Sequence, residues 1–78
     1  MSTILEVYYC WPIDRTREER ITAEVVRSGG KLSFREEPNE LSRAVCLTFE
    51  FADREVAKVA ASAIRSLGEH VEGPSDYE

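Results

Sequence analysis

Two cysteines and a single histidine are the side chains of this 78-residue sequence best suited to nucleophilic or metal chemistry. Cys10 and Cys46 supply thiols, and His70 supplies an imidazole. Zinc accepts both kinds of ligand, but a structural zinc site needs four ligands, and its usual sequence signal is a closely spaced cysteine pair. The two cysteines lie far apart in the sequence. We therefore expect no cofactor and regard Cys10, Cys46 and His70 only as candidate metal ligands.

The pair Cys10 and His70 would also suit thiol–imidazole catalysis if folding brought the two together. Such catalysis needs a base within hydrogen-bond reach, a third group that orients the base, and donors for a developing oxyanion. No segment supplies these groups recognisably, and buried cysteines commonly act as small hydrophobic residues. We expect no catalytic residue. Whether the chain is an enzyme stays open, with a non-enzymatic role favoured.

Alternating apolar and polar residues predict strands over 3–11, 31–37 and 44–51, and a short fourth strand over 69–72. The second strand is the most polar, which is typical of a sheet edge. Leu32 and Phe34 should face the core there, and Arg35 should face outward. The inward residues of the two other long strands are Leu5, Val7, Tyr9, Trp11, Val45, Leu47, Phe49 and Phe51.

Two helices are predicted between the strands. A capping box formed by Thr16 and Glu19 should begin the first helix, and Gly29 and Gly30 should end it. Asp53 should cap the second helix, which runs to about residue 67. We expect the charged residues at the start of the first helix, which are Asp14, Arg15, Arg17, Glu18, Glu19 and Arg20, to form a solvated surface. The inward stripe predicted for the second helix consists of Val56, Val59, Ala60, Ala63, Ile64 and Leu67.

This order of elements predicts an α+β fold. A right-handed crossover through the first helix makes strands one and two parallel and leaves a gap that strand three fills. The result is a ferredoxin-like βαββα(β) sandwich, an antiparallel sheet of strand order 4-1-3-2 with two helices on one face. Residues 1–72 should form this single domain, and residues 73–78 an acidic C-terminal tail.

Strands one and three should be antiparallel neighbours in this sheet. Pairing Cys10 with Cys46 would place Glu6 opposite Glu50, and like charges directly opposite one another are destabilising. A shift of two residues pairs Tyr8 with Cys46 and removes the repulsion. We therefore expect the two thiols to be diagonal neighbours.

One face of the predicted sheet carries no helix, and its residues are more apolar than a solvated face requires. We expect it to contact another protein or a second copy of the chain. Trp11 and Pro12 should lie at its rim, and Arg35 at one edge. The predicted contact residues are Ile4, Tyr8, Cys10, Cys46 and Thr48.

Residues 46–55, followed by an alanine-rich helix, resemble the third strand and second helix of RNA-recognition motifs. The resemblance covers about a third of the chain and implies base stacking on outward aromatic residues of strands one and three. Here the outward positions of strand three are Cys46 and Thr48, and strand one offers only Tyr8. Glu6 and Glu50 share that face, so we expect no nucleic-acid partner.

Composition narrows the function further. Asp and Glu outnumber Lys and Arg by 15 to 10, which gives a net charge of -5. Residues 1–6 do not read as a signal peptide, no stretch has membrane-spanning length, and two cysteines are too few for a disulfide framework. We expect a cytoplasmic association or regulatory module, in which a homodimer is one possibility. A small-molecule-sensing domain is the alternative, followed by an RNA-recognition-like binder and a thiol or metal site.

Overall fold

The computed structural model describes residues 2–77. Residues 1 and 78, which the sequence analysis assigned to the domain and to the tail, lie outside the described part. The elements in chain order are β1 (Ser2–Cys10), α1 (Arg15–Arg27), β2 (Lys31–Glu36), β3 (Ala44–Phe51), α2 (Arg54–Ser66) and β4 (His70–Tyr77).

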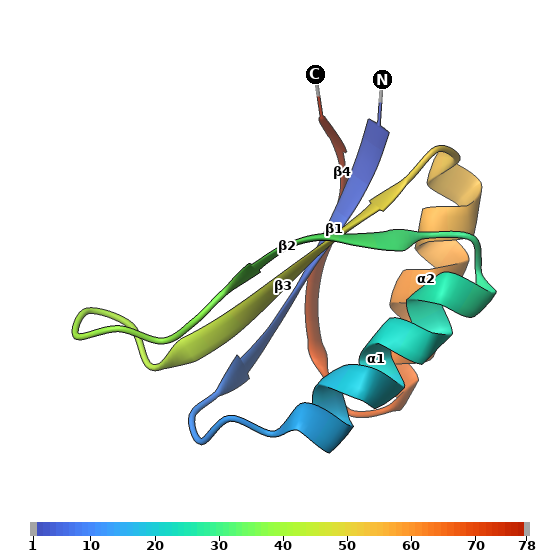
Figure 1. The fold of residues 1–78 in the computed structure, drawn as a ribbon. Helices are drawn as coiled ribbons and strands as arrows, with labels where there is room; N and C mark the ends of the chain where they lie inside the picture. Colours follow the sequence, from blue (N-terminus) through green and yellow to red (C-terminus); the bar gives the residue numbers. More distant parts are fainter. Residues whose placement is uncertain (1, 78) are drawn as a thin grey trace.

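The four strands form one sheet in the order β2-β3-β1-β4, and every neighbouring pair is antiparallel. Both helices lie on the same side of this sheet (Figure 1). The fold is the predicted ferredoxin-like α+β sandwich, with strand order 4-1-3-2 when read from the other edge. The sheet therefore has one face covered by α1 and α2 and one face that no helix covers.

The pairing of β1 with β3 follows the predicted register. Tyr8 lies opposite Cys46, Cys10 opposite Ala44, and Glu6 opposite Thr48. Glu6 nevertheless meets a like charge on its other side, because β4 places Glu72 directly opposite it. The repulsion argument selected the correct register between two strands, but it could not include a third strand whose length was unknown.

A β-bulge in β2 changes which side chains face the helices. The register with β3 shifts between Leu32 and Phe34, and this additional residue reverses the alternation of side chains beyond it. Phe34, predicted to face the core, lies opposite Thr48 on the uncovered face and is 61% exposed. Arg35, predicted on the uncovered face, points toward the helices instead.

The last strand is longer than predicted. Strand β4 runs to Tyr77, and its second half pairs Ser75 with Ile4 and Asp76 with Thr3. Residues 73–77, predicted as an acidic tail, are therefore part of the sheet. The pairing resumes after a second bulge at Gly73 and Pro74, and the start of β1 lies beside the end of β4, where Ser2 pairs with Tyr77 (Figure 1). Local propensity gave no sign of this second half of the strand, since Gly and Pro are poor strand formers.

The first helix begins two residues earlier than the predicted capping box. Asp14 has an extended backbone and accepts a hydrogen bond from the N–H of Arg17 at 3.0 Å, so it is the N-cap. Thr16 lies in the first turn and Glu19 just beyond it, and both are exposed. An aspartate is the stronger cap here because its full negative charge also interacts with the positive end of the helix dipole.

The two glycines that end α1 have different roles. Gly29 has a φ of +96°, a left-handed conformation that glycine adopts without steric cost. Gly30 is needed for packing, because an added Cβ would lie 2.5 Å from Cε2 of Phe51 and 2.8 Å from Cγ1 of Val25. The helix therefore turns back directly against the core.

The buried face of α2 is rotated relative to the prediction. Ala57 and Ala61 are buried in place of Val59, which is 67% exposed, and Leu67 is 38% exposed. Small side chains let the helix backbone approach the sheet closely, whereas valine at these positions would hold it away. The core between the helices and the sheet consists of Leu5, Val7, Tyr9, Ile21, Val25, Val45, Leu47, Phe49, Phe51, Ala57, Ala60, Ala61, Ile64 and Val71.

Within residues 2–77, neither helix has the length and apolar character needed to cross a membrane.

Candidate functional site

The uncovered face of the sheet is organised in three rows of side chains that run across the strands. The rows follow from the pairing of β2 with β3, β3 with β1, and β1 with β4. The first row is Glu36, Cys46, Tyr8 and His70. The second row is Phe34, Thr48, Glu6 and Glu72. The third row is Lys31, Glu50, Ile4 and Ser75. We call these twelve residues the uncovered face.

Negative charge dominates the uncovered face. Its four glutamates are Glu6, Glu36, Glu50 and Glu72, and Lys31 is its only lysine or arginine. A hydrogen bond donated by Ser33 keeps the pKa of Glu50 below its usual value, assisted by Ser2 and by the charge of Lys31. Glu50 therefore remains ionised under mildly acidic conditions, and the face keeps its negative potential.

Tyr8 lies in the first row of the uncovered face, between Cys46 and His70. Its hydroxyl donates to Oε2 of Glu6 at 3.3 Å, and its ring centroid lies 6.1 Å from that of His70. Desolvation by burial, followed by the hydrogen bond with Cys46, raises the pKa of the phenol. The phenol is therefore neutral at physiological pH and presents a flat apolar ring with a polar tip. Such amphipathic rings are frequent at protein interfaces.

The predicted contact residues divide into two groups. Ile4, Tyr8 and Thr48 are partly exposed on the uncovered face, and Cys10 is exposed at the end of β1. Cys46 lies on the same face but is only 7% exposed, so its thiol contributes little contact area.

Sequence reasoning missed the second aromatic residue of the uncovered face, Phe34, and two of its acids, Glu36 and Glu72. The bulge in β2 moves Phe34 onto this face, and regular alternation contains no signal of a bulge. Glu72 could have been found from its spacing of two residues from His70, because both belong to the short fourth strand that was predicted beside the first.

The two thiols and His70 do not converge on one point. Tyr8 stands between Cys46 and His70 in the first row, so these two side chains are separated by a whole strand. His70 instead lies with Nε2 3.1 Å from Oε2 of Glu72. No group of three or more His, Cys, Asp or Glu side chains among residues 2–77 is arranged to hold a metal ion.

Burial also makes Cys46 a poor nucleophile. Desolvation raises the pKa of its thiol, and nearby carboxylates add to this effect, although hydrogen bonds with Tyr8 and Thr48 oppose it. The reactive species of a cysteine is its thiolate, which a raised pKa makes scarce at neutral pH. The surroundings of Cys46 therefore favour packing over chemistry.

A buried ion cluster lies on the helix side of the sheet, where the sequence predicted a solvated surface. Glu18 is only 7% exposed and accepts hydrogen bonds from Arg35 and from the hydroxyl of Tyr9. Arg35 also donates to Glu37 at 2.6 Å. The hydrogen bond from Arg35 lowers the pKa of Glu18 despite the opposing effect of burial. These contacts connect α1 with β1 and β2, which is a structural role.

Arg17 makes a second contact that the sequence did not indicate. Its guanidinium lies 4.8 Å from the centre of the Tyr9 ring and donates from Nε to both carboxylate oxygens of Glu69, at 2.9 and 2.8 Å. Glu69 follows α2, so the ion pair joins the start of one helix to the end of the other. Arg17 is thereby occupied within the fold.

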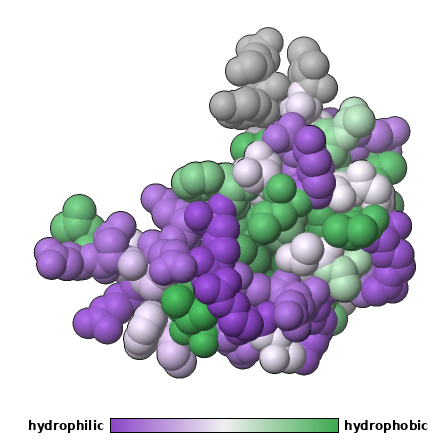
Figure 2. All heavy atoms as spheres, viewed as in Figure 1, coloured by the Kyte–Doolittle hydropathy of each residue, from purple (hydrophilic) through white to green (hydrophobic). Residues whose placement is uncertain are grey.

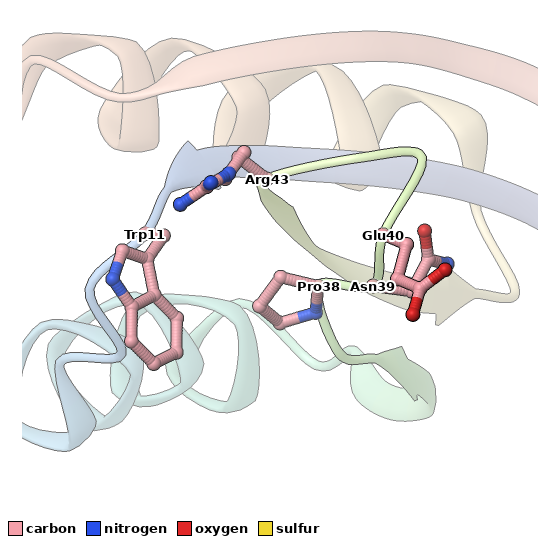
Figure 3. Close-up of a pocket in the computed structure, with 5 residues that line it drawn as sticks. All are labelled: Trp11, Pro38, Asn39, Glu40 and Arg43. Atoms are coloured by element: carbon pink, nitrogen blue, oxygen red, sulfur yellow. The ribbon is translucent and has the colours of Figure 1, made fainter.

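A hollow of about 380 Å³ lies beside the loop between β2 and β3. Figure 3 shows the indole of Trp11 next to the ring of Pro38, with Arg43 above them. Trp11 is 53% exposed, and its backbone N–H donates to the carbonyl of Arg43 at 2.7 Å. Trp11, predicted at the rim of the contact face, thus lines a separate site.

Comparison with protein-family models, with curated proteins and with solved structures yields no match for this chain.

Proposed function

We propose that this protein is an association module whose uncovered face binds a basic partner protein. The observation that carries the proposal is the combination, on one sheet face, of one exposed and two partly exposed apolar side chains with four glutamates. Phe34, Ile4 and Tyr8 offer apolar contact area, as the contact residues of a protein interface do. The surrounding carboxylates select a partner with complementary positive charge.

The same charges weigh against two alternatives. Stacking the uncovered faces of two copies would bring eight glutamates together, and like charges held close in an interface cost several kcal/mol, roughly. The same glutamates would repel the phosphates of a nucleic acid. The remaining partner class is a protein segment that carries lysine or arginine between apolar residues.

An eight-residue peptide of alternating lysine and leucine, labelled with a fluorophore, is a suitable probe of this chemistry. We expect it to bind with an affinity that falls as salt is added, and to shift the amide NMR signals of Tyr8, Phe34 and Thr48. Shifts concentrated on α1 and α2 would contradict the proposal.

A matched pair of variants separates the uncovered face from net charge alone. Glu6→Gln with Glu72→Gln removes two charges from the uncovered face. The double variant should weaken peptide binding about fivefold, since two exposed charge contacts contribute about 1 kcal/mol together to the binding free energy. Glu19→Gln with Glu55→Gln removes two charges from the exposed surfaces of the helices. Equal weakening by both pairs would mean that the peptide senses only the overall charge, and would reject the site.

Small-molecule sensing is a second candidate, and the hollow beside Trp11 favours it. The hollow is lined by the exposed indole, the Pro38 ring, Asn39, Glu40 and Arg43. The two rings suit a flat ligand, and Arg43, which forms no ion pair within the described chain, suits an anionic group on it. Trp11 is the single tryptophan, so its fluorescence reports on this hollow. Titration with benzoate should change the emission and raise the melting temperature, and Arg43→Ala should abolish both effects. Unchanged emission up to 20 mM benzoate, on the order of the weakest useful affinity, would count against it.

A further inference from the structure

The free edge of β2 differs from the other edge of the sheet. Strands β2 and β4 each have only one neighbour. Pro74 in β4 has no N–H to donate, and Arg54 covers that stretch by donating to the carbonyl of Pro74 and by pairing with Asp76 at 2.8 Å. Proline and local charge pairs are common protections of an edge strand. Strand β2 contains no proline, and residues 31–34 are all exposed.

The sequence of β2 is self-complementary when two copies run antiparallel. With the two-fold axis between Ser33 and Phe34, Lys31 of each copy lies opposite Glu36 of the other, which forms two opposite-charge pairs. Neither Lys31 nor Glu36 forms an ion pair elsewhere in residues 2–77. Opposite charges directly across an antiparallel pair are stabilising. Charged residues on an edge strand usually prevent it from pairing with another chain. In β2, the order of Lys31 and Glu36 instead places opposite charges across from each other in two copies.

The bulge in β2 makes this pairing geometrically consistent. Residues five apart in a regular strand point to opposite faces. Because the bulge reverses the alternation, Lys31 and Glu36 both project on the uncovered face, opposite Glu50 and Cys46 of β3. Each Lys31 therefore meets the Glu36 of the other copy on the same face of a continuous sheet. Without the bulge the same register would set the paired residues on opposite faces.

Apolar groups at the edge would be buried by the same pairing. Phe34, 61% exposed, would lie beside the two-fold axis and close to Phe34 of the second copy. On the helix side, Leu32 and Val26 are exposed along a hollow between α1 and β2. Figure 2 shows green, apolar side chains on this side of the molecule, between stretches of purple polar ones. The stem of Arg35 from the second copy would cover Leu32, since arginine side chains readily pack their apolar part.

We propose that two copies of this chain associate through antiparallel pairing of their β2 strands, which forms a continuous eight-stranded sheet with all four helices on one face. The inference does not rest on the proposed function, because β2 pairs by its edge and leaves the uncovered face open apart from Lys31, Phe34 and Glu36. In the dimer, the two uncovered faces become one longer acidic surface.

Charge-swap variants measured by analytical ultracentrifugation test the dimer. At micromolar concentration or above, the wild type should have a solution mass twice the 8.9 kDa of the single chain. Lys31→Glu or Glu36→Lys alone sets like charges opposite each other twice and should weaken the dimer about tenfold. The double variant Lys31→Glu with Glu36→Lys restores both pairs in reversed order and should recover the wild-type affinity to within about threefold.

Control variants distinguish edge pairing from other association. Glu19→Lys makes the same charge change as Glu36→Lys at an exposed position of α1 and should leave the dimer unchanged. Phe34→Lys should abolish the dimer while circular dichroism stays native. A wild type that remains monomeric at about 200 µM, a concentration far above ordinary interface affinities, would overturn the proposal. So would single charge variants that dimerise normally, or a double variant that is not rescued. Peptide binding at Glu6 and Glu72 would survive any of these results.

Discussion

Arg35 donates from Nε to Oε1 of Glu18 at 2.7 Å and from Nη2 to Oε2 at 2.9 Å, and this two-point contact ties the edge strand β2 to the first turn of α1. The hydroxyl of Tyr9 donates to the same carboxylate from β1. These charges are largely shielded from water. Each partner therefore depends on the others to replace the hydrogen bonds to water that it lost on folding.

Glu18→Gln should lower the free energy of unfolding by about 2 kcal/mol. The substitution keeps the size of the side chain but removes the buried charge that faces Arg35, which leaves the partly buried guanidinium with only the exposed Glu37 as counter-ion. Urea denaturation followed by circular dichroism measures the change. Glu19→Gln, next in sequence and exposed, should change it by less than about 0.5 kcal/mol. Equal effects of the two variants would contradict the buried ion cluster.

The contribution of Glu18 to stability should disappear in acid. Its pKa in the folded state is below the usual value of about 4.3 that it has in the unfolded chain, so folding releases protons from this group. The stabilisation is complete above the unfolded pKa and declines as the pH falls below it and passes through the folded pKa. The groups that face this carboxylate are Arg35, Tyr9 and Arg15.

Unfolding free energies of the wild type and of Glu18→Gln, measured between pH 7 and pH 2.5, check this direction. The difference between the two proteins should be constant near neutral pH and shrink steadily in the acid range. Glu50 also has a lowered pKa, but it titrates in both proteins and cancels in the difference. A difference that grows on acidification would show that the pKa of Glu18 is raised.

Asp14→Ala should destabilise the protein by about 1 kcal/mol, because the N–H of Arg17 loses its acceptor and the helix dipole loses a favourable charge. Thr16→Ala, which alters the predicted cap, should have almost no effect, since alanine suits a helix interior. Thermal denaturation of the two variants decides between the caps. A larger loss of stability for Thr16→Ala than for Asp14→Ala would show that Thr16, as the sequence predicted, is the N-cap.

The bulge in β2 predicts opposite outcomes for two phenylalanines. Phe49→Ala should lower the free energy of unfolding by about 3–5 kcal/mol, because Phe49 is fully buried and truncation leaves a cavity. Phe34→Ala should cost less than about 1 kcal/mol, because its ring is mostly in solvent. Urea unfolding at a protein concentration low enough to avoid association makes the comparison. Similar costs would mean that Phe34 faces the helices after all.

The sequence by itself determined the order of the elements, the antiparallel sheet and the pairing of Tyr8 with Cys46, because these depend on local alternation, helical spacing and pairwise charge. Tyr8, Ile4 and Thr48 could be placed on the uncovered face for the same reason. Strict alternation holds in β1 and β3, and the inward positions predicted there are buried: Leu5, Val7, Tyr9, Val45, Leu47, Phe49 and Phe51. Trp11, also predicted inward, follows the end of β1 and is 53% exposed, so that prediction was wrong.

Only the tertiary structure decided where that alternation breaks and which polar groups are buried. The bulge that exposes Phe34 and turns Arg35 toward Glu18 depends on how β2 fits against β3, and a one-residue shift there reverses every later side chain. Glu18 could be buried only because Arg35 and Tyr9, from two other strands, arrive to satisfy its charge. These contacts join residues distant in sequence, and local patterns carry no record of them.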